Sequence, residues 1–318
     1  MKFPVLKSWL LTFIVCLSTG CSGIDSSNSA RSDSAYRVPI VLDGSLQNPA
    51  WSPDGESIVL TRFRNGYNKG PADLVVYDYE SGEIKILVSD GYDNVNLPGS
   101  AWNRATDQIV FSSSREPHDE IFSISADANS GGEVKITDRV ELAAYEPSFS
   151  PDGQWIVFES HKVDVEDNGI ITKYKIDGTE AYQTLTDIKD DCRQPNWSPD
   201  GDHILYQAMS NDQWEIWIMN ADGTDKRQLT SGLGDKTDAS FSPDGQWIVY
   251  SGDSPTMEFA NLFVVSMSGG EPTRVTYFNG YDGAPSWSPD GQQLIFESSR
   301  DNAENSPGTT LWIINLER

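Results

Sequence analysis

The chain has 318 residues, 37% of them hydrophobic, which is enough for a substantial core, and its formal net charge at pH 7 is −25. So acidic a chain repels nucleic acid, anionic lipid surfaces and polyanionic glycans over long range. No strong local basic patch interrupts the acidic composition. We therefore expect no nucleic-acid partner, and we expect no role in tracking phosphates or binding polyuronates.

The first twenty residues have the pattern of an export signal. Lys2 and Lys7 precede an apolar run from Trp9 to Leu17, which is too short and too close to the terminus for a stable membrane span. We therefore predict that residues 1–20 are a signal peptide and that the mature chain starts at Cys21.

The segment Ser18-Thr19-Gly20-Cys21 resembles the bacterial lipoprotein signal, in which small residues precede a cysteine that is acylated. Leu17 lies four residues before Cys21, whereas that family usually has leucine three residues before it. The resemblance implies lipidation of Cys21, a lipid anchor and, because Ser22 is not aspartate, an outer-membrane lipoprotein facing the periplasm. A plain secretory signal, giving a soluble periplasmic or secreted protein, is the alternative.

Residues 21–35 are rich in Ser, Asn and Asp and are expected to form a disordered tether, because they cannot bury enough apolar surface to fold. Cys192 is the only other cysteine outside the predicted signal peptide. If Cys21 is acylated, the mature chain has no internal disulfide, and Cys192 is expected to be a packed thiol.

A short phrase recurs through the rest of the chain. Trp-Ser-Pro-Asp-Gly or Phe-Ser-Pro-Asp-Gly ends at Gly55, Gly153, Gly201, Gly245 and Gly291, and a degraded copy begins at Trp102. The opening aromatic residues are 51, 47, 48, 44 and 46 residues apart, close to the period of propeller blades.

Each repeat can be divided into four strands. In the fourth repeat we expect them at 195–198, 203–207, 214–220 and 226–230, with the Pro-Asp-Gly turn between the first two strands and a second tight turn at 221–224. Proline presets its own backbone angle and glycine accepts a positive φ, so both turns can reverse the chain tightly. In the fifth repeat we expect the second and third strands at 247–250 and 261–267.

The two ends of the repeat region complement each other. The last repeat stops after its third strand, at 310–316, and an unassigned strand at 36–42 precedes the first repeat. We therefore predict an all-β, six-bladed propeller over residues 36–318, in which the N-terminal strand completes the last blade.

The Pro-Asp-Gly repeats resemble the propeller domain of the TolB family over essentially the whole folded chain, from Tyr36 to Arg318. TolB itself has an α/β domain before the propeller, and here only the short polar segment stands there. The resemblance therefore implies a TolB-like lipoprotein propeller that lacks the N-terminal domain of TolB, which leaves the TolA-facing part of TolB function in doubt.

The alternation of strand direction places the loops on two faces. The Pro-Asp-Gly turns and the turns between third and fourth strands share one face, here called the turn face. The connections between second and third strands, and those between blades, share the other, here called the long-loop face. The long segments assigned to it are 61–73, 112–120, 161–169, 252–260 and 299–309, and a binding surface is expected there.

First strands line the central channel of a propeller. Three residues before the key aromatic residues stand Asn48, Gly99, Glu146, Gln194, Asp238 and Ala284. We predict a polar channel mouth with Asn48, Glu146, Gln194 and Asp238 as binding candidates, which could hold a cation or the charged tip of a partner peptide. A solvated channel entrance without a ligand is the alternative and the commoner case.

Candidate metal-binding and catalytic groups are few. Asp164, Glu166 and Asn168 have the acidic alternation of a calcium loop, but its twelfth position is Lys175 in place of glutamate, so calcium remains a lesser alternative to no cofactor. His118 and His161 are assigned to loops and His203 to the start of a strand, too scattered for the histidine cluster of a catalytic zinc. No G-x-S-x-G elbow of a hydrolase is present.

These patterns favour a monomeric, non-catalytic propeller that binds an envelope protein through its long-loop face. A carbohydrate-binding or carbohydrate-degrading lyase or hydrolase is the alternative, since some lyases resemble this fold. Those lyases rely on histidines and a metal in the channel, and the first strands here lack such histidines. A sensor or assembly factor with a small ligand is a third reading.

Overall fold

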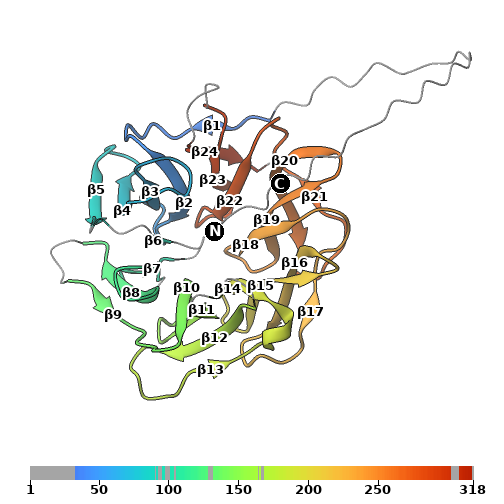
Figure 1. Ribbon diagram of the computed structural model, residues 1–318. Helices are drawn as coiled ribbons and strands as arrows, with labels where there is room; N and C mark the ends of the chain where they lie inside the picture. The colour runs from blue at the N-terminus through green and yellow to red at the C-terminus, as the bar shows by residue number, and fades with distance from the viewer. Residues whose placement is uncertain are drawn as a thin grey trace, which may run out of the picture.

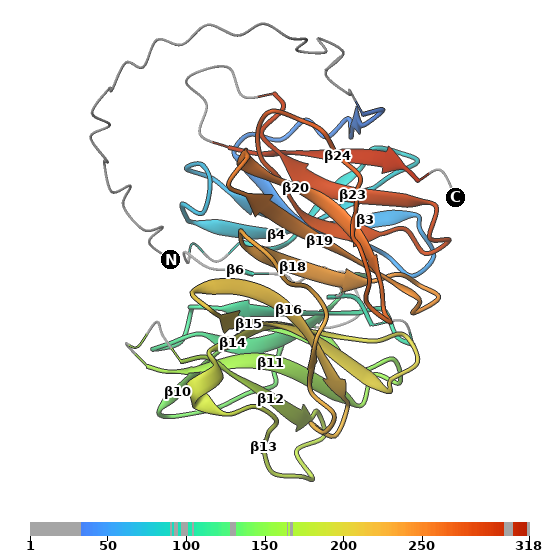
Figure 2. The ribbon, with the colours of Figure 1, turned by 90° about the vertical axis from the view of Figure 1, so that its right-hand side faces the viewer.

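The computed structural model describes residues 33–89, 91, 95–96, 101–103, 105–127, 132–163, 165, 168–301 and 308–316. These residues form six four-stranded antiparallel sheets, arranged as blades in a ring (Figure 1). The first strand of each blade lies toward the centre and the fourth at the periphery. Figure 2 views the ring from the side, with the blue and red blades together above the green and yellow ones. The prediction of a six-bladed, all-β propeller is confirmed.

The blades follow the chain in order. Blade one contains β2 (Ser45–Trp51), β3 (Ser57–Phe63), β4 (Ala72–Asp78) and β5 (Ile84–Val88). Blade two contains β6 (Val95–Asn96), β7 (Gln108–Ser113), β8 (Glu120–Ser125) and β9 (Val134–Lys135). Blade three contains β10 (Leu142–Phe149), β11 (Trp155–Lys162), β12 (Ile170–Lys175) and β13 (Gln183–Thr184), and the 3-10 helix η1 (Ile188–Asp190) follows it.

The second half of the ring repeats this plan. Blade four contains β14 (Cys192–Trp197), β15 (His203–Ser210), β16 (Gln213–Asn220) and β17 (Arg227–Gln228). Blade five contains β18 (Lys236–Phe241), β19 (Trp247–Ser254), β20 (Met257–Ser266) and β21 (Thr273–Arg274). Blade six contains β22 (Asp282–Trp287), β23 (Gln293–Ser298), β24 (Thr310–Asn315) and, as its outer strand, β1 (Tyr36–Arg37).

The N-terminal strand closes the ring as expected. Tyr36 pairs with Ile313 and Arg37 with Trp312, and the N–H of Val38 continues the pairing by donating to the carbonyl of Leu311 at 2.9 Å. The strand itself is shorter than the predicted 36–42, because beyond Val38 the chain turns toward blade one. The first and last thirds of the sequence therefore share one sheet.

The recurrent phrase is a turn with its own hydrogen bonds. In the first copy, the Ser52 hydroxyl donates to Asp54 at 2.5 Å and accepts the N–H of Ser57 at 2.9 Å. The other four copies repeat both bonds with serine and aspartate at the same places. The Ser52 hydroxyl and the N–H of Glu56 lower the pKa of Asp54. The phrase thus specifies a charged, self-contained turn on the turn face.

The core lies between the blades. Six apolar clusters are each built from two adjacent blades; one example joins Ile295, Leu311 and Ile313 of blade six to Ile58 and Leu60 of blade one. The aromatic residue that opens every phrase is buried at the inner edge of such a cluster. Each blade can therefore bury both faces only when both neighbours are in place.

The structure departs from the expected elements in blade five. Residues 252–260 were expected to be a long loop, yet β19 continues to Ser254 and β20 begins at Met257, with Ser254 paired to Met257. The two strands form a long hairpin closed by a short turn, because the backbone pairing between them continues to Ser254 and Met257.

Candidate functional site

The predicted channel-mouth residues occupy one repeated backbone position. Asn48, Glu146, Gln194 and Asp238 lie in β2, β10, β14 and β18, where the pairing with the second strand shifts register. Their φ angles are 50°, 49°, 50° and 54°, and Ala284 in β22 has φ 46°. Position 99 lies outside the described residues. Such left-handed conformations are costly for residues other than glycine, so the bulge is a special feature of every first strand that the structure describes fully.

Gln194 joins two predicted candidates from the blades on either side. Its Nε2 donates to Asp238 Oδ1 at 3.0 Å and to Glu146 Oε1 at 3.4 Å, while its Oε1 accepts the backbone N–H of Asp238 at 2.9 Å. Glu146 is buried, and Gln194 and Asp238 are half-buried. A neutral amide thus lies between two carboxylates at the channel mouth.

A second ring of polar side chains supports these bulges from the second strands. Glu297 Oε2 accepts the N–H of Asn48 at 2.9 Å, Glu159 Oε2 that of Gln194 at 3.0 Å, and the Ser251 hydroxyl that of Ala284 at 3.2 Å. In each case a buried side chain of one blade accepts the bulge N–H of the next blade. The equivalent residues in the remaining blades are Thr61, Ser112 and Gln207, also buried.

Glu297 is the centre of a cluster that the sequence did not predict. Its Oε1 accepts the hydroxyls of Tyr281 at 3.0 Å and Tyr67 at 3.2 Å, and those two hydroxyls are 3.2 Å apart. Tyr67 comes from the loop between β3 and β4, Tyr281 from the connection before β22, and Glu297 from β23. Three segments of two adjacent blades therefore meet at this carboxylate.

The environment of Glu297 changes its acidity. Burial raises its pKa to about 7, helped by the charge of Asp238 and opposed by the N–H of Asn48 and the two tyrosine hydroxyls. Burial and the nearby Glu297 and Asp238 carboxylates raise the pKa of Tyr67 and Tyr281. The mouth is thus an acidic site in which further negative charge is disfavoured.

One sequence signal could have located Glu297. An acidic residue follows a buried phenylalanine within an apolar second strand in two blades, at Phe158-Glu159 and Phe296-Glu297. A carboxylate at a core position of a strand requires hydrogen-bond donors from a neighbour. The tyrosines carry no comparable signal, because the loop conformation decides where they point.

His161 does not lie in a loop, as was expected, but in β11, where it is buried. Its Nε2 contacts Glu159 Oε1, and its ring packs edge-on against Tyr145. His118 lies in the loop before β8, as expected, with Nε2 against the carbonyl of Arg139. His203 begins β15 as predicted. Strand β11 extends further than the pattern indicated because its polar end pairs with β10, with His161 opposite Ala143 and Lys162 opposite Leu142.

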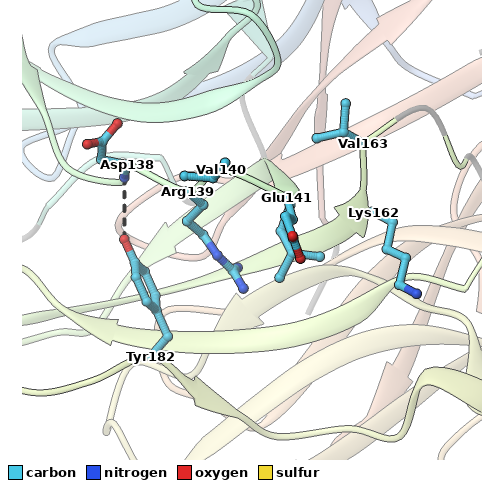
Figure 3. Close-up of a pocket in the computed structure, with 8 residues that line it drawn as sticks. Asp138, Arg139, Val140, Glu141, Lys162, Val163 and Tyr182 are labelled. Carbon is cyan, nitrogen blue, oxygen red and sulfur yellow. Dashed lines mark hydrogen bonds between the residues drawn. The ribbon is translucent and has the colours of Figure 1, made fainter.

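The outer junction of blades two and three contains a shallow hollow of about 820 Å³, drawn in Figure 3. Tyr182 lies on one side of it and Lys162 and Val163 on the other, with the connection carrying Arg139 and Val140 between them. The Tyr182 hydroxyl accepts the N–H of Asp138 at 3.4 Å, and the Arg139 guanidinium lies over the Tyr182 ring at 4.8 Å. These contacts hold the connection in a fixed position and leave Val140 exposed.

Exposed aliphatic side chains recur on the long-loop face. Val41, Val140 and Leu233 are 90%, 91% and 68% exposed, and each lies in a connection between blades. Ile188, in η1, is a further exposed residue of the connection between blades three and four. The turn face instead presents the Ser-Pro-Asp-Gly turns. Exposed aliphatic side chains thus occur in four connections between blades, on the face where the sequence predicts binding.

The other predicted sites are placed as follows. Cys21, Asp164 and Glu166 lie outside the described residues, and Asn168 is an exposed loop residue with φ 68°. Cys192 is buried, and burial raises its pKa to about 12, as a packed thiol requires. Among the residues that the structure describes, no His, Cys, Asp and Glu side chains gather as a group of three or more suited to a metal. None of the described segments is a helix with the length and apolarity of a membrane span.

Comparison with known proteins agrees with this architecture. Residues 170–308 match the family model of the TolB beta propeller domain. The Tol-Pal system protein TolB of Anaeromyxobacter dehalogenans is 27% identical over 212 residues, which cover 59% of this chain and 45% of the relative. The uncharacterized peptidase YuxL of Bacillus subtilis is 27% identical over 186 residues, covering 57% of this chain and 25% of the relative. The chain thus spans less than half the length of these two relatives.

Solved structures extend the likeness to nearly the whole propeller. TolB from Acinetobacter baumannii superposes with a TM-score of 0.62 at 18% identity, covering 86% of this chain and 64% of that one. The oligogalacturonate lyase of Vibrio parahaemolyticus superposes with a TM-score of 0.59 at 12% identity, covering 91% and 96%. At such identities the likeness concerns the fold alone. By its repeats, its ring closure and these matches, the chain is a TolB-like six-bladed β-propeller.

Proposed function

We propose that the chain is a non-catalytic lipoprotein propeller of the cell envelope that binds an envelope protein through its long-loop face. The observation that carries the proposal is the set of exposed aliphatic residues on the connections between blades: Val41, Val140, Ile188 and Leu233. Each lies in a different connection on the same face of a rigid scaffold, and loops on such a face are where binding residues concentrate.

The rigidity of this face supports a recognition role. Arg139 is held beneath the exposed Val140 by its ring contact with Tyr182 and by a 2.5 Å bond to the Ser160 hydroxyl. Asp191, which ends the connection carrying Ile188, accepts the N–H of Gly169 at 2.8 Å. A surface fixed before binding loses little conformational entropy on association.

The proposed location rests on the sequence. The leader-like residues 1–20 and Cys21 favour lipidation, an outer-membrane anchor and exposure to the periplasm, with a soluble periplasmic or secreted form as the alternative. One relative is a Tol-Pal system protein, which supports a role in the envelope. The proposal includes a monomer and no cofactor, with calcium near Asn168 as the lesser alternative.

Affinity capture from solubilised envelopes tests the proposed surface. The Val140→Ser/Leu233→Ser variant removes two aliphatic side chains from the long-loop face. The matched control, Ile86→Ser/Val134→Ser, removes two exposed aliphatic side chains from the outer strands β5 and β9. We expect wild type and the control to recover the same protein, and the long-loop variant to recover at least about tenfold less of it.

Two results would contradict the proposal. Equal recovery by both variants would place the contact elsewhere on the propeller. Specific recovery or turnover of a glycan, with no protein partner, would favour the carbohydrate-active alternative, for which the fold of the oligogalacturonate lyase is the one structural parallel named above.

A further inference from the structure

At the mouth of the channel, the side-chain amide of Gln194 has hydrogen-bond partners for both its nitrogen and its oxygen. The Oε1 of Gln207 has none among the residues that the structure describes. We infer that the mouth is a receptor site for the ammonium or guanidinium group of a partner's lysine or arginine side chain, and that Gln194 occupies this site until the partner displaces it. This inference rests on the proposed protein-binding function and names the chemistry of the contact.

Gln194 already occupies the place that a cationic group would take. Its Nε2 donates to carboxylates on both sides, Asp238 at 3.0 Å and Glu146 at 3.4 Å. An ammonium or guanidinium group could replace these donated bonds one for one and would add an ionic attraction to two carboxylates. The charge of Asp238 also helps to raise the pKa of Glu297, so a cation bound at Asp238 would relieve this repulsion as well.

The second observation is an acceptor without a donor. Gln207 is 6% exposed, and its Oε1 has no hydrogen-bond partner among the residues that the structure describes. It occupies the second-strand position at which Glu159, Ser251 and Glu297 each accept the bulge N–H of the next blade. A buried amide oxygen left unsatisfied is costly, so the arrangement requires an explanation.

The missing donor can be identified. The pattern assigns to Gln207 the N–H of Asp238, the bulge residue of the next blade. That N–H instead donates to Gln194 Oε1 at 2.9 Å. If Gln194 leaves the mouth, the Asp238 N–H becomes available to Gln207, and blade four then follows the same pattern as blades three, five and six. Displacement of Gln194 therefore breaks the hydrogen bond from the Asp238 N–H to Gln194 Oε1 and allows the same N–H to donate to Gln207 Oε1.

The surroundings favour an organic cation carried by a partner. The half-buried Gln194 and Asp238 can be reached from solvent, and the long-loop face that leads to them carries the exposed aliphatic residues. A lysine or arginine side chain has an apolar stem as well as a charged head, so it matches both features. The partner segment is accordingly expected to present a basic residue flanked by apolar ones.

Nuclear magnetic resonance of the whole propeller provides the binding test. The side-chain amide signals of Gln194 are followed at constant ionic strength during titration with Nα-acetyl-lysine methylamide, Nα-acetyl-arginine methylamide, their norleucine analogue, or calcium chloride. We expect saturable shifts with the lysine or arginine probe and none with norleucine. Saturation by calcium alone, or by no probe, would overturn the inference.

Isosteric variants show where the probe binds. Glu146→Gln and Asp238→Asn keep the shape of the mouth and each remove one charge, so each is expected to weaken probe binding at least about tenfold. Gln194→Ala lacks the side-chain amide, so its binding of the probe is followed by the backbone amide signal of Asp238. Binding is expected to be stronger, since the internal competitor is gone; Ala284 shows that alanine fits this bulge conformation. Weaker binding by Gln194→Ala would make Gln194 a ligand rather than a plug.

A thermodynamic cycle tests the exchange of acceptors separately. Gln207→Ala should cost only the packing of its buried side chain and no hydrogen bond of its Oε1, because that atom makes none in the present state. The Gln194→Ala/Gln207→Ala variant should lose more stability than the sum of the two single variants, since the Asp238 N–H then has neither acceptor. Additive losses would contradict the exchange.

The affinity capture described above separates failure of this inference from failure of the proposed function. If Glu146→Gln and Asp238→Asn still recover the partner as wild type does, the protein-binding role stands and the cation site is wrong. If wild type recovers no partner but the lysine or arginine probe saturates the mouth, the site instead serves a free organic cation, which overturns its assignment to a partner side chain.

Discussion

The carboxylate of Glu297 accepts the backbone N–H of Asn48 at 2.9 Å, which joins the last blade to the first inside the channel. The same two blades are linked at the periphery because β1, which pairs with β24 in the last blade, continues along the chain into β2 of the first. The closure of the ring therefore includes a backbone pairing at the periphery and a buried carboxylate in the channel. The contact through the carboxylate depends on pH because the carboxylate can be protonated.

Glu297→Gln is expected to stabilise the propeller at neutral and higher pH. The pKa of Glu297 is about 7 in the folded chain, above its ordinary value of 4.5, so between these values the folded state binds more protons than the unfolded state. This carboxyl therefore lowers stability as the pH rises through that window. Relative to wild type, the variant should gain on the order of 2 kcal/mol between pH 5 and pH 8. Urea denaturation at both pH values measures the gain.

The control for this experiment is Glu80→Gln, which changes an exposed carboxylate of the turn between β4 and β5. The stability of this variant relative to wild type should not change comparably between pH 5 and pH 8. If the difference between Glu297→Gln and wild type is the same at pH 5 and pH 8, the carboxylate does not titrate in this window.

Arg300→Met is expected to destabilise the closed blade strongly. The Arg300 guanidinium bonds Asp33 at 2.7 and 2.9 Å and Asp282 at 2.7 and 3.2 Å, and both carboxylates are almost fully buried. Removal of the cation leaves two buried carboxylates without their partner, at a cost of about 3 to 5 kcal/mol. The free energy of unfolding in urea measures this cost.

The matched control is Arg37→Met, which breaks the exposed pair with Asp301, whose side chains are 51% and 36% exposed. It should cost less than about 1 kcal/mol. Equal losses in the two variants would mean that the interactions of Arg300 with Asp33 and Asp282 do not stabilise the fold.

Ala284→Gly is expected to leave stability unchanged or to raise it by up to about 1 kcal/mol, because the left-handed φ of 46° penalises alanine. Ala143→Gly, in the regular part of β10, should instead destabilise by about 1 kcal/mol. Thermal unfolding of both variants measures the contrast. A similar loss in both would show that the bulge conformation carries no strain.

The sequence predicts the architecture well because the repeat imposes it. The Ser-Pro-Asp-Gly turns fix where first and second strands meet, and the unpaired strand at Tyr36 finds its place because the last repeat has only three. The position three residues before each aromatic also leads to Asn48, Glu146, Gln194 and Asp238. These features depend on local spacing and need no knowledge of loop conformation.

The rest of the site depends on contacts between blades. Tyr67 and Tyr281 reach Glu297 from a loop and a connection whose conformations no periodicity specifies. The proposed transfer of the Asp238 N–H from Gln194 to Gln207 can be inferred only by comparing the hydrogen bonds at the same position in four blades. The blade-five hairpin differs from the expected loop for another reason: polar residues between 252 and 260 pair through their backbone within the blade, which side-chain polarity does not reveal.

The most direct test of the proposed binding surface is photocrosslinking from single positions in cells that produce the chain. A photoreactive residue at Val140 or Leu233 lies on the long-loop face, and one at Trp247, also exposed, lies beside the turn face. We predict one discrete protein adduct from positions 140 and 233 and none from position 247. An adduct from position 247 alone, or none from any of the three, would contradict binding through the long-loop face.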